Sequence, residues 1–178
     1  MNKPIVPSQI RKVFAGRIFT VSVESITLPG GHKLEAEVIR HPGSVVLIPV
    51  LDTGEIVLVR QYRHAIGRSA WELPAGSLHH GEEPRAAAVR ECQEEISLVP
   101  AAVEAIGSFF PTPGYCDEEM HFFRATGLRA PRQGDPDVHQ DKDEDIETKP
   151  FSVETIRRMI ASGEIIDLKT VAALALCY

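Results

Sequence analysis

The chain has 178 residues, a hydrophobic content of 43%, a charged content of 25% and a formal net charge of −6 at pH 7. These values fit one soluble domain with a sizeable core, and the acidic balance argues against a nucleic-acid partner. We expect no membrane partner, because no apolar run has the length of a signal peptide or a membrane span. An acidic protein that acts on an anionic substrate would need a metal ion and local arginines.

The three cysteines are scattered along the chain and form neither a zinc-binding spacing nor a disulfide framework. They are Cys92, Cys116 and Cys177. This pattern predicts a reducing compartment, and we therefore expect a cytoplasmic protein.

The first predicted structure is an antiparallel hairpin within Arg17–Arg40. Alternating residues from Ile18 to Ile26 predict one strand, Pro29-Gly30-Gly31 predicts a turn, and Lys33–Ile39 predicts the return strand. The hairpin has two open interpretations, an ordinary surface hairpin or an element for dimerisation. We expect residues 1–43 to form this region and residues 44–178 to form the remaining domain.

A nearly continuous apolar run, Ser44–Val50, predicts a strand that is buried on both faces. Asp52-Thr53-Gly54 predicts a hairpin turn, with Glu55–Arg60 as the partner strand. Arg63 and Arg68 follow this strand, where their forked donors could face a phosphate; solvation at the surface is the ordinary alternative. Trp71, the only tryptophan, is expected in the core or at its edge.

A helix is predicted from Pro84, because proline suits the first helical turn and three alanines follow it. Ala88, Cys92 and Ile96 form an apolar stripe, while a second face carries three acids, Glu91, Glu94 and Glu95. Carboxylates on one helical face repel one another unless a cation lies there, which suggests Mg²⁺ or Mn²⁺. The ordinary alternative is a solvated acidic surface.

The rest of the chain predicts two strands, a long polar loop and two helices. The strands are Ala102–Phe110 and His121–Ala125, the loop is Arg129–Glu147, and the helices are Ser152–Ser162 and Asp167–Leu176. The loop is strongly acidic, so it is either a solvated connection or a segment that delivers a catalytic carboxylate.

The stretch Gly76–Leu98 resembles the Nudix box in both residue type and spacing. The matching positions are Gly76, Glu82, Arg90, Glu91, Glu94, Glu95 and Leu98. Ser97 departs from the pattern, because the family has a glycine there that ends the helix in a left-handed turn. The segments Gln61-Tyr62-Arg63, Trp71–Gly76 and Pro113 resemble the ADP-ribose pyrophosphatase branch of that family.

The resemblance implies an α/β fold, the Nudix α/β/α sandwich with a mixed sheet, and the N-terminal antiparallel hairpin as an addition. It implies a Mg²⁺- or Mn²⁺-dependent hydrolase of a small-molecule nucleoside-diphosphate sugar, with ADP-ribose as the closest case, and a homodimer. Hydrolysis of another nucleotide sugar or a dinucleotide, or a non-catalytic nucleotide sensor, is the alternative. A sensor would not need to keep all three glutamates of the helix.

The resemblance also carries expected roles onto individual residues. The expected metal ligands are Glu91 and Glu95, with Glu94 and the carbonyl of Ala75, while Glu82 is expected either behind these ligands or at an outer metal ion. Arg90 is expected to orient the glutamates, and Arg63 to contact the diphosphate, with Glu72 and Glu118 as weaker substrate or metal contacts. The general base maps to Glu144, and a shift of register could replace it with Asp141, Asp143 or Asp145.

Overall fold

The structure is a computed structural model that describes residues 4–135 and 146–178. The described residues form strands, α-helices and one short 3-10 helix, η1 (His64–Ile66). The strands are β1 (Gln9–Ala15), β2 (Thr20–Thr27), β3 (Lys33–Arg40), β4 (Ser44–Pro49), β5 (Ile56–Arg63), β6 (Arg68–Glu72), β7 (Ala75–Ser77), β8 (Ala102–Phe109), β9 (Met120–Thr126) and β10 (Glu147–Phe151). The helices are α1 (Pro84–Ile96), α2 (Val153–Ala161) and α3 (Leu168–Cys177).

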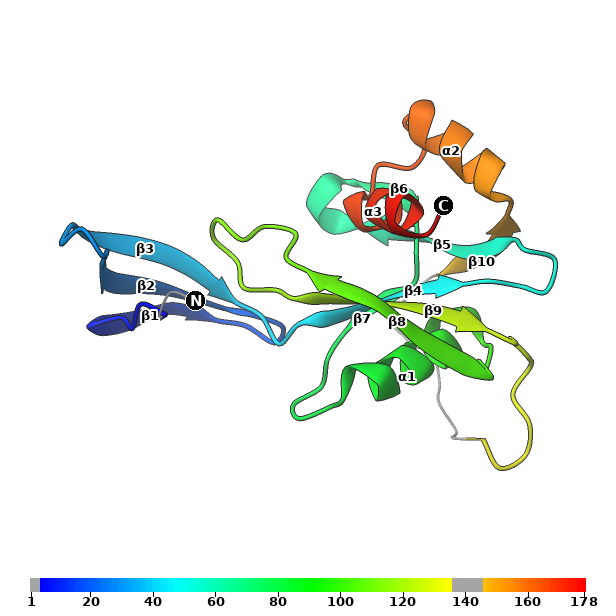
Figure 1. Cartoon of the computed structure of the whole chain (residues 1–178), viewed down its shortest axis with the longest axis horizontal. Coiled ribbons are helices and arrows are strands. Elements are labelled where there is room, and N and C mark those ends of the chain that lie inside the picture. The colour runs from blue at the N-terminus through cyan, green and yellow to red at the C-terminus, as the bar shows by residue number, and fades with distance from the viewer. Residues whose placement is uncertain (1–3, 136–145) are drawn as a thin grey trace.

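The central layer is a mixed sheet in the order β7-β4-β9-β8, in which β4 pairs parallel with β9. Figure 1 shows α1 on one side of this sheet and α2 and α3 on the other side. The small sheet β10-β5-β6 lies on the same side as α2 and α3. The predicted α/β class with a mixed sheet is therefore confirmed.

The apolar strands β4 and β5 contribute side chains to two hydrophobic cores, because successive side chains of a strand point to opposite faces. Val46 and Ile48 of β4 lie in the core that α2 and α3 cover. Val45 and Leu47 lie in the core that α1 covers. All four side chains are fully buried, which confirms the prediction of a strand buried on both faces.

The predicted hairpin between Ser44–Val50 and Glu55–Arg60 is largely wrong. The chain does turn at Asp52-Thr53-Gly54, with Leu51 donating to the carbonyl of Glu55 at 2.9 Å, but only the bridge between Val50 and Ile56 follows. The strands then enter different sheets, because both edges of β4 pair with β7 and β9. β5 pairs instead with β6 and with β10.

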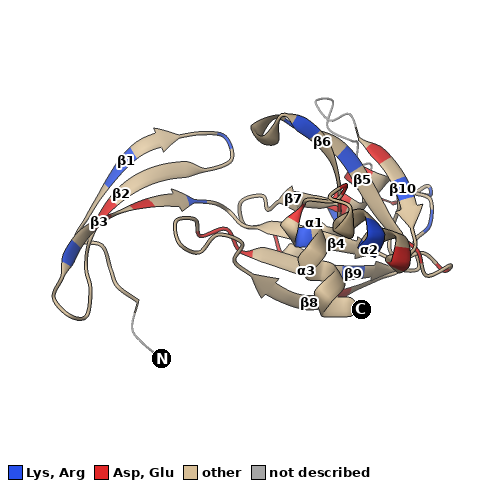
Figure 2. Ribbon diagram, turned by 90° about the horizontal axis from the view of Figure 1, so that it is seen from above, with Lys and Arg blue, Asp and Glu red and all other residues tan. Residues whose placement is uncertain are grey.

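The N-terminal region is a separate antiparallel sheet in the order β1-β2-β3, and Figure 2 shows it extending away from the rest of the molecule. The predicted pair of strands corresponds to β2 and β3, which pair from Thr20–Arg40 to Thr27–Lys33. The third strand, β1, was not predicted, because it is exposed throughout and a bulge near Val13 interrupts its alternation.

No helix within residues 4–135 and 146–178 has the length and apolar character needed to cross a membrane.

Helix α1 ends at Ser97 in the left-handed conformation, with φ 54° and ψ 34°. Ser97 is the single non-glycine residue with positive φ in the described part of the chain. Its N–H donates to the carbonyl of Gln93 at 3.0 Å, so the helix closes as it would with glycine. The departure from the Nudix pattern therefore leaves the geometry of the helix end intact, at the cost of a strained serine.

We expect Ser97→Gly to raise the free energy of unfolding by about 1 kcal/mol, because glycine adopts this conformation without steric cost. Urea denaturation of both proteins measures this difference. The matched control is Ser162→Gly at the end of α2, where φ is −82° and glycine relieves nothing. Equal effects of the two substitutions would show that the conformation of Ser97 carries no strain.

Candidate active site

The acidic face of α1 points into the protein rather than into solvent. Glu91 and Glu95 are 7% and 5% exposed, and Glu94 is partly exposed. These three side chains line a cavity of about 460 Å³ together with β7 and its following loop. The ordinary alternative, a solvated acidic helix surface, is therefore wrong for Glu91 and Glu95.

Glycine at position 76 is required by the close approach of β7 to α1. A Cβ atom added to Gly76 would lie 1.8 Å from Oε1 of Glu91, so the Glu91 carboxylate would have to leave its position. Next to it, the N–H of Ala75 donates to Oε2 of Glu95 at 3.1 Å. The strand therefore presents its backbone to the carboxylates, and Ala75, Gly76 and both glutamates share one cavity wall.

Arg90 is the cation that holds these acids together. It donates to Oε1 of Glu91 at 2.7 Å and to Oε2 of Glu94 at 2.5 Å. It also forks onto Glu82 at 2.9 and 3.0 Å, and reaches the carbonyl of Ser77 at 3.2 Å. Burial alone would lower the pKa of Arg90, but hydrogen bonds to Glu82 and the charge of Glu91 outweigh burial and raise it.

Glu82 serves mainly to hold Arg90 in place. Besides the arginine fork, its Oε2 accepts a hydrogen bond from the N–H of His79 at 2.9 Å. The hydrogen bond from Arg90 is the chief reason that the pKa of Glu82 lies below its usual range. Glu82 also does not belong to the described cavity lining, which places it behind Arg90 and not beside Glu95.

The donor set fits a hard divalent cation in chemical type. Carboxylates of Glu91, Glu94 and Glu95 and the backbone at Ala75 surround one cavity, and Mg²⁺ and Mn²⁺ prefer oxygen ligands. Among the described residues, Arg90 brings positive charge to Glu91 and Glu94. Accordingly, no three acidic, histidine or cysteine side chains of the described residues converge as a ligand group.

Arg63 is paired with Glu72 instead of projecting freely. Its Nε and Nη2 donate to the two carboxylate oxygens of Glu72 at 2.7 and 3.0 Å. Burial is the largest single influence and lowers the pKa of Arg63, but the hydrogen bond to Glu72 together with the charges of Glu72, Glu95 and Asp167 outweighs it and raises the pKa. Arg63 therefore lies close enough to Glu95 of α1 to be affected by its charge. Lys169 of α3 pairs with the same Glu72.

Glu118 lies beside the beginning of β4, where its Oε1 accepts a hydrogen bond from Ser44 Oγ at 2.8 Å. This contact fastens the segment before β9 to the beginning of β4. Glu118 is not among the described residues that line the carboxylate cavity, so its weaker expected role remains a prediction.

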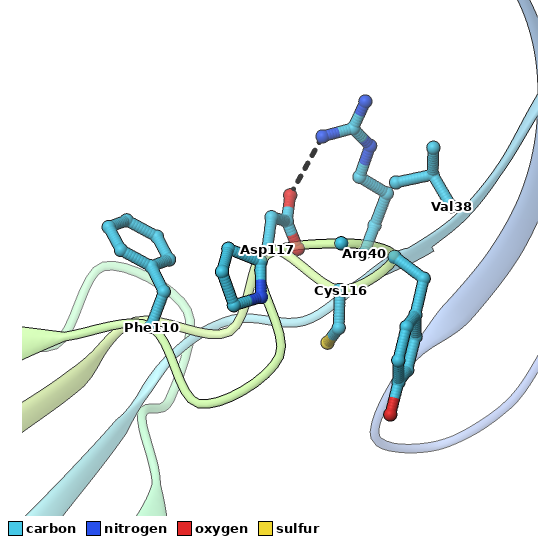
Figure 3. A pocket seen from close by; sticks show the side chains of 8 residues that line it. Val38, Arg40, Phe110, Cys116 and Asp117 are labelled. Atoms are coloured by element: carbon cyan, nitrogen blue, oxygen red, sulfur yellow. Dashed lines mark hydrogen bonds and ion pairs between the residues drawn. The ribbon is translucent and has the colours of Figure 1, made fainter.

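A second cavity, of about 350 Å³, lies between β3 and the loop that follows β8 (Figure 3). Figure 3 shows the Asp117 carboxylate directed at Arg40, whose Nη1 donates to it at 2.9 Å. Arg40 also pairs at 2.7 Å with Glu24, and this hydrogen bond lowers the pKa of Glu24. The single acid in the described lining is thus already neutralised, so we assign the candidate active site to the first cavity.

Two further residues at the carboxylate cavity were not predicted from sequence. Arg17 and Ile18, from the turn between β1 and β2, line it from the N-terminal sheet. In the sequence, the Gly16-Arg17 pair marks only the beginning of the predicted hairpin and indicates no site. The residue predicted as general base, Glu144, lies outside the described residues, as do Asp141, Asp143 and Asp145.

Comparison with known proteins agrees with this geometry. A family model described as NUDIX domain matches residues 40–174, and the chain therefore belongs to the NUDIX family and is a hydrolase. Hydrolases of this family generally depend on a divalent metal ion.

Among its relatives, the chain is 34% identical to an ADP-ribose pyrophosphatase of Bacillus subtilis (strain 168), over 92% of this chain and 86% of the relative. It is 35% identical to the ADP-ribose pyrophosphatase of Mycobacterium tuberculosis, over 88% of this chain and 75% of the relative. It is equally 35% identical to a methanol dehydrogenase activator of Bacillus methanolicus, over 91% and 86%.

A crystal structure of an ADP compounds hydrolase superposes with a TM-score of 0.77, covering 98% of this chain and 92% of that chain at 18% identity. At this identity the likeness concerns the fold, and it confirms the predicted Nudix architecture. The predicted family and its ADP-ribose pyrophosphatase branch are likewise confirmed by the relatives.

We expect Gly76→Ala to lower the free energy of unfolding by about 1–3 kcal/mol, because the new methyl group must displace the Glu91 carboxylate. Gly30→Ala is the matched control, since its Cβ would meet only a His32 ring atom at 3.5 Å. Urea denaturation compares the two variants. If Gly76→Ala is as stable as the control, the close contact between β7 and Glu91 is wrong.

Proposed function

We propose that the protein hydrolyses the diphosphate bond of a nucleoside-diphosphate sugar, most closely ADP-ribose, to AMP and ribose 5-phosphate. The observation that carries this proposal is the wall of glutamates and strand backbone around one cavity, beside a paired arginine. Two of the relatives named above carry the corresponding activity in their names. The methanol dehydrogenase activator is as similar, so the substrate must be tested directly.

In this proposal Glu91, Glu95 and Glu94, with the carbonyl of Ala75, hold Mg²⁺ or Mn²⁺. A bound ion of this kind neutralises phosphate oxygens and lowers the pKa of water. Arg90 keeps the glutamates oriented when no substrate is bound, through the hydrogen bonds described above. Arg63 donates to the diphosphate, and its pairing with Glu72 fixes the direction of its guanidinium group.

The proton acceptor in this proposal is Glu144, because a carboxylate committed to a metal ion is a poor base. It belongs to the long polar segment that precedes β10. A base on a loop suits the reaction, since water must enter before hydrolysis and product must leave afterwards.

A substrate other than ADP-ribose is the first alternative. A GDP-mannose pyrophosphatase of Escherichia coli O1:K1 / APEC is 29% identical over 92% of this chain and 90% of the relative. A nucleotide sensor without catalysis is the second alternative. It is disfavoured because Glu91, Glu94 and Glu95 are all present, and a sensor would not need all three.

We further infer a homodimer and a cytoplasmic location. The N-terminal sheet carries exposed apolar side chains that a monomer would leave in water, among them Ile10, Val13, Phe14, Ile18 and Leu34. The three cysteines are all free thiols, as a reducing compartment would keep them.

The test of function is a panel of nucleotide sugars and dinucleotides, assayed with Mg²⁺ or Mn²⁺ as phosphate release through a coupled phosphatase. We expect ADP-ribose to have the highest kcat/KM. Preference for a GDP or UDP sugar would support the first alternative. Binding of ADP-ribose without turnover on any compound would support the sensor.

For the metal site, Glu95→Gln and Glu91→Gln should each lower kcat by orders of magnitude while the fold persists, because each removes a negative ligand. The control is Glu83→Gln, an exposed residue at the beginning of the same helix without a side-chain capping bond. Circular dichroism checks the fold. Near-normal turnover of both site variants in saturating Mg²⁺ would refute the ligand assignment.

For the base, Glu144→Gln should lower kcat strongly, leave KM and metal affinity nearly unchanged, and flatten the acid limb of the pH–rate profile. Asp141→Asn, Asp143→Asn and Asp145→Asn serve as matched controls from the same segment. Equal and mild effects of all four substitutions would indicate a general electrostatic role in place of a specific base.

For assembly, sedimentation at micromolar concentration should detect a dimer, and Val13→Asp should shift it toward monomer by placing a charge in the interface. Leu176→Asp, at an exposed position near the end of α3, is the control and should leave the dimer intact. A monomeric wild-type protein would contradict the inference.

A further inference from the structure

Lys169 is a buried lysine outside the Nudix box. Its side chain is only 8% exposed, although it lies in the first turn of α3. It pairs with the buried Glu72 and with Asp167, whose Oδ1 lies 3.0 Å from Lys169 Nζ. Because a buried lysine is costly unless paired, this position has a specific requirement for its charge.

The beginning of α3 is also hydrogen-bonded to the backbone at Leu73. Thr170 Oγ1 accepts a hydrogen bond from the N–H of Leu73 at 2.9 Å, in the segment that leads into β7. Asp167 caps the helix by accepting from the N–H of Thr170 at 3.0 Å, and it accepts from Thr170 Oγ1 at 2.5 Å. Helix α3 thus contacts residues 72 and 73 through two side chains that are 97 positions away in the sequence.

Glu72 is shared between two cations of different exposure. The side chain of Glu72 is 3% exposed, that of Lys169 is 8% exposed, and that of Arg63 is 41% exposed. Lys169 approaches one carboxylate oxygen from inside, and Arg63 forks across both from outside. Arg63 uses Nε and Nη2 for this fork, which leaves Nη1 without a hydrogen bond to any described residue.

The charges of this group balance only when Lys169 is present. Arg63 and Lys169 are cations, whereas Glu72 and Asp167 are anions, so the group of four is neutral. Loss of the lysine charge would leave a net negative group beside Glu95, whose charge Arg63 already senses. A negative group at this place would repel a diphosphate and would hold Arg63 more tightly against Glu72.

We propose that Lys169 is a positioning residue that acts through Glu72 to present Arg63 to the diphosphate of the substrate. Lys169 pairs with Glu72 from the buried side, so that Arg63 stays oriented while its Nη1, which has no hydrogen bond to a described residue, is able to donate to an anion. This inference rests on the proposed function only in naming the anion as the substrate diphosphate.

The test compares Lys169→Met, which keeps chain length but removes charge, with Lys169→Arg, which keeps the charge. We expect Lys169→Met to raise KM for ADP-ribose about tenfold and to change kcat less than about threefold. Lys169→Arg should restore much of the loss. Lys149→Met is the control, because this exposed lysine of β10 lies over Phe151 and contacts none of the four charged groups.

A double-mutant cycle separates positioning from general support of the fold. In an Arg63→Ala background, Lys169→Met should raise KM much less than in the wild type, because only its direct charge effect remains when the arginine is missing. The same cycle is measured by calorimetry of inorganic pyrophosphate binding without added metal ion. Additive effects in both measurements would overturn the proposal, as would unchanged binding and KM in Lys169→Met.

If Lys169→Met does not fold, two other measurements still test the proposal. Asp167→Asn keeps a capping side chain while removing the second charge partner of Lys169, which leaves the group of four with a net positive charge. It should therefore strengthen pyrophosphate binding, the opposite of the change expected for Lys169→Met. In the NMR spectrum, the Arg63 Nε–H signal should move in Asp167→Asn and not in Lys149→Met. No change in either measurement would overturn the proposal.

The outcome is also distinguishable from failure of the proposed function. The effects of the substitutions on pyrophosphate binding could be non-additive while the wild type does not hydrolyse ADP-ribose. This result would refute the proposed substrate and keep the role of Lys169. A protein that hydrolyses ADP-ribose but gives additive cycles would keep the function and refute the role. Absence of pyrophosphate binding to the wild type would overturn the role of Arg63 and with it that of Lys169.

Discussion

The site depends on one electrostatic constraint, the crowding of carboxylates against the backbone of β7. Glu91 and Glu95 are buried, and Gly76 approaches Glu91 so closely that an added methyl group would displace the Glu91 carboxylate. Such a cluster is stable only with a cation among its members, because buried like charges repel strongly. Arg90 supplies that cation, and Glu82 holds Arg90 from behind. In the proposed function, a metal ion and a diphosphate would replace part of these arginine contacts.

The fold serves this cluster by fixing the segment Glu72–Gly76 from two sides. From one side, Glu95 of α1 accepts the N–H of Ala75. From the other side, Thr170 of α3 accepts the N–H of Leu73. The two helices can act on the same short segment because β4 and β5 bury alternate side chains in two cores, one under each helical layer. Rigid strands between two packed layers give the site the precision that chemistry on a diphosphate requires.

The two halves of the site have different origins in the chain. The Nudix box supplies the acidic cluster and Arg90, which suit diphosphate chemistry in general. The remaining wall comes from outside the box, with Arg17 and Ile18 from the N-terminal sheet. In the proposed function, these outer elements would distinguish one nucleotide sugar from another, because the box contacts only what all such substrates share. The N-terminal sheet would then contribute both to assembly and to substrate choice.

Local pattern was sufficient for the features that depend on nearby residues. The helix from Pro84, its acidic and apolar faces and the doubly buried strand Ser44–Pro49 all follow from spacing, and the glutamate motif identified the family. Tertiary structure alone decided the pairings between distant segments. It separated β4 from β5, since β9 and β7 occupy both edges of β4, and it added the exposed strand β1. The tertiary structure also brought Lys169 into contact with Glu72, 97 positions away in the sequence. Local sequence could not predict this contact, because a lysine in a first helical turn has the same sequence context whether it faces solvent or a buried carboxylate.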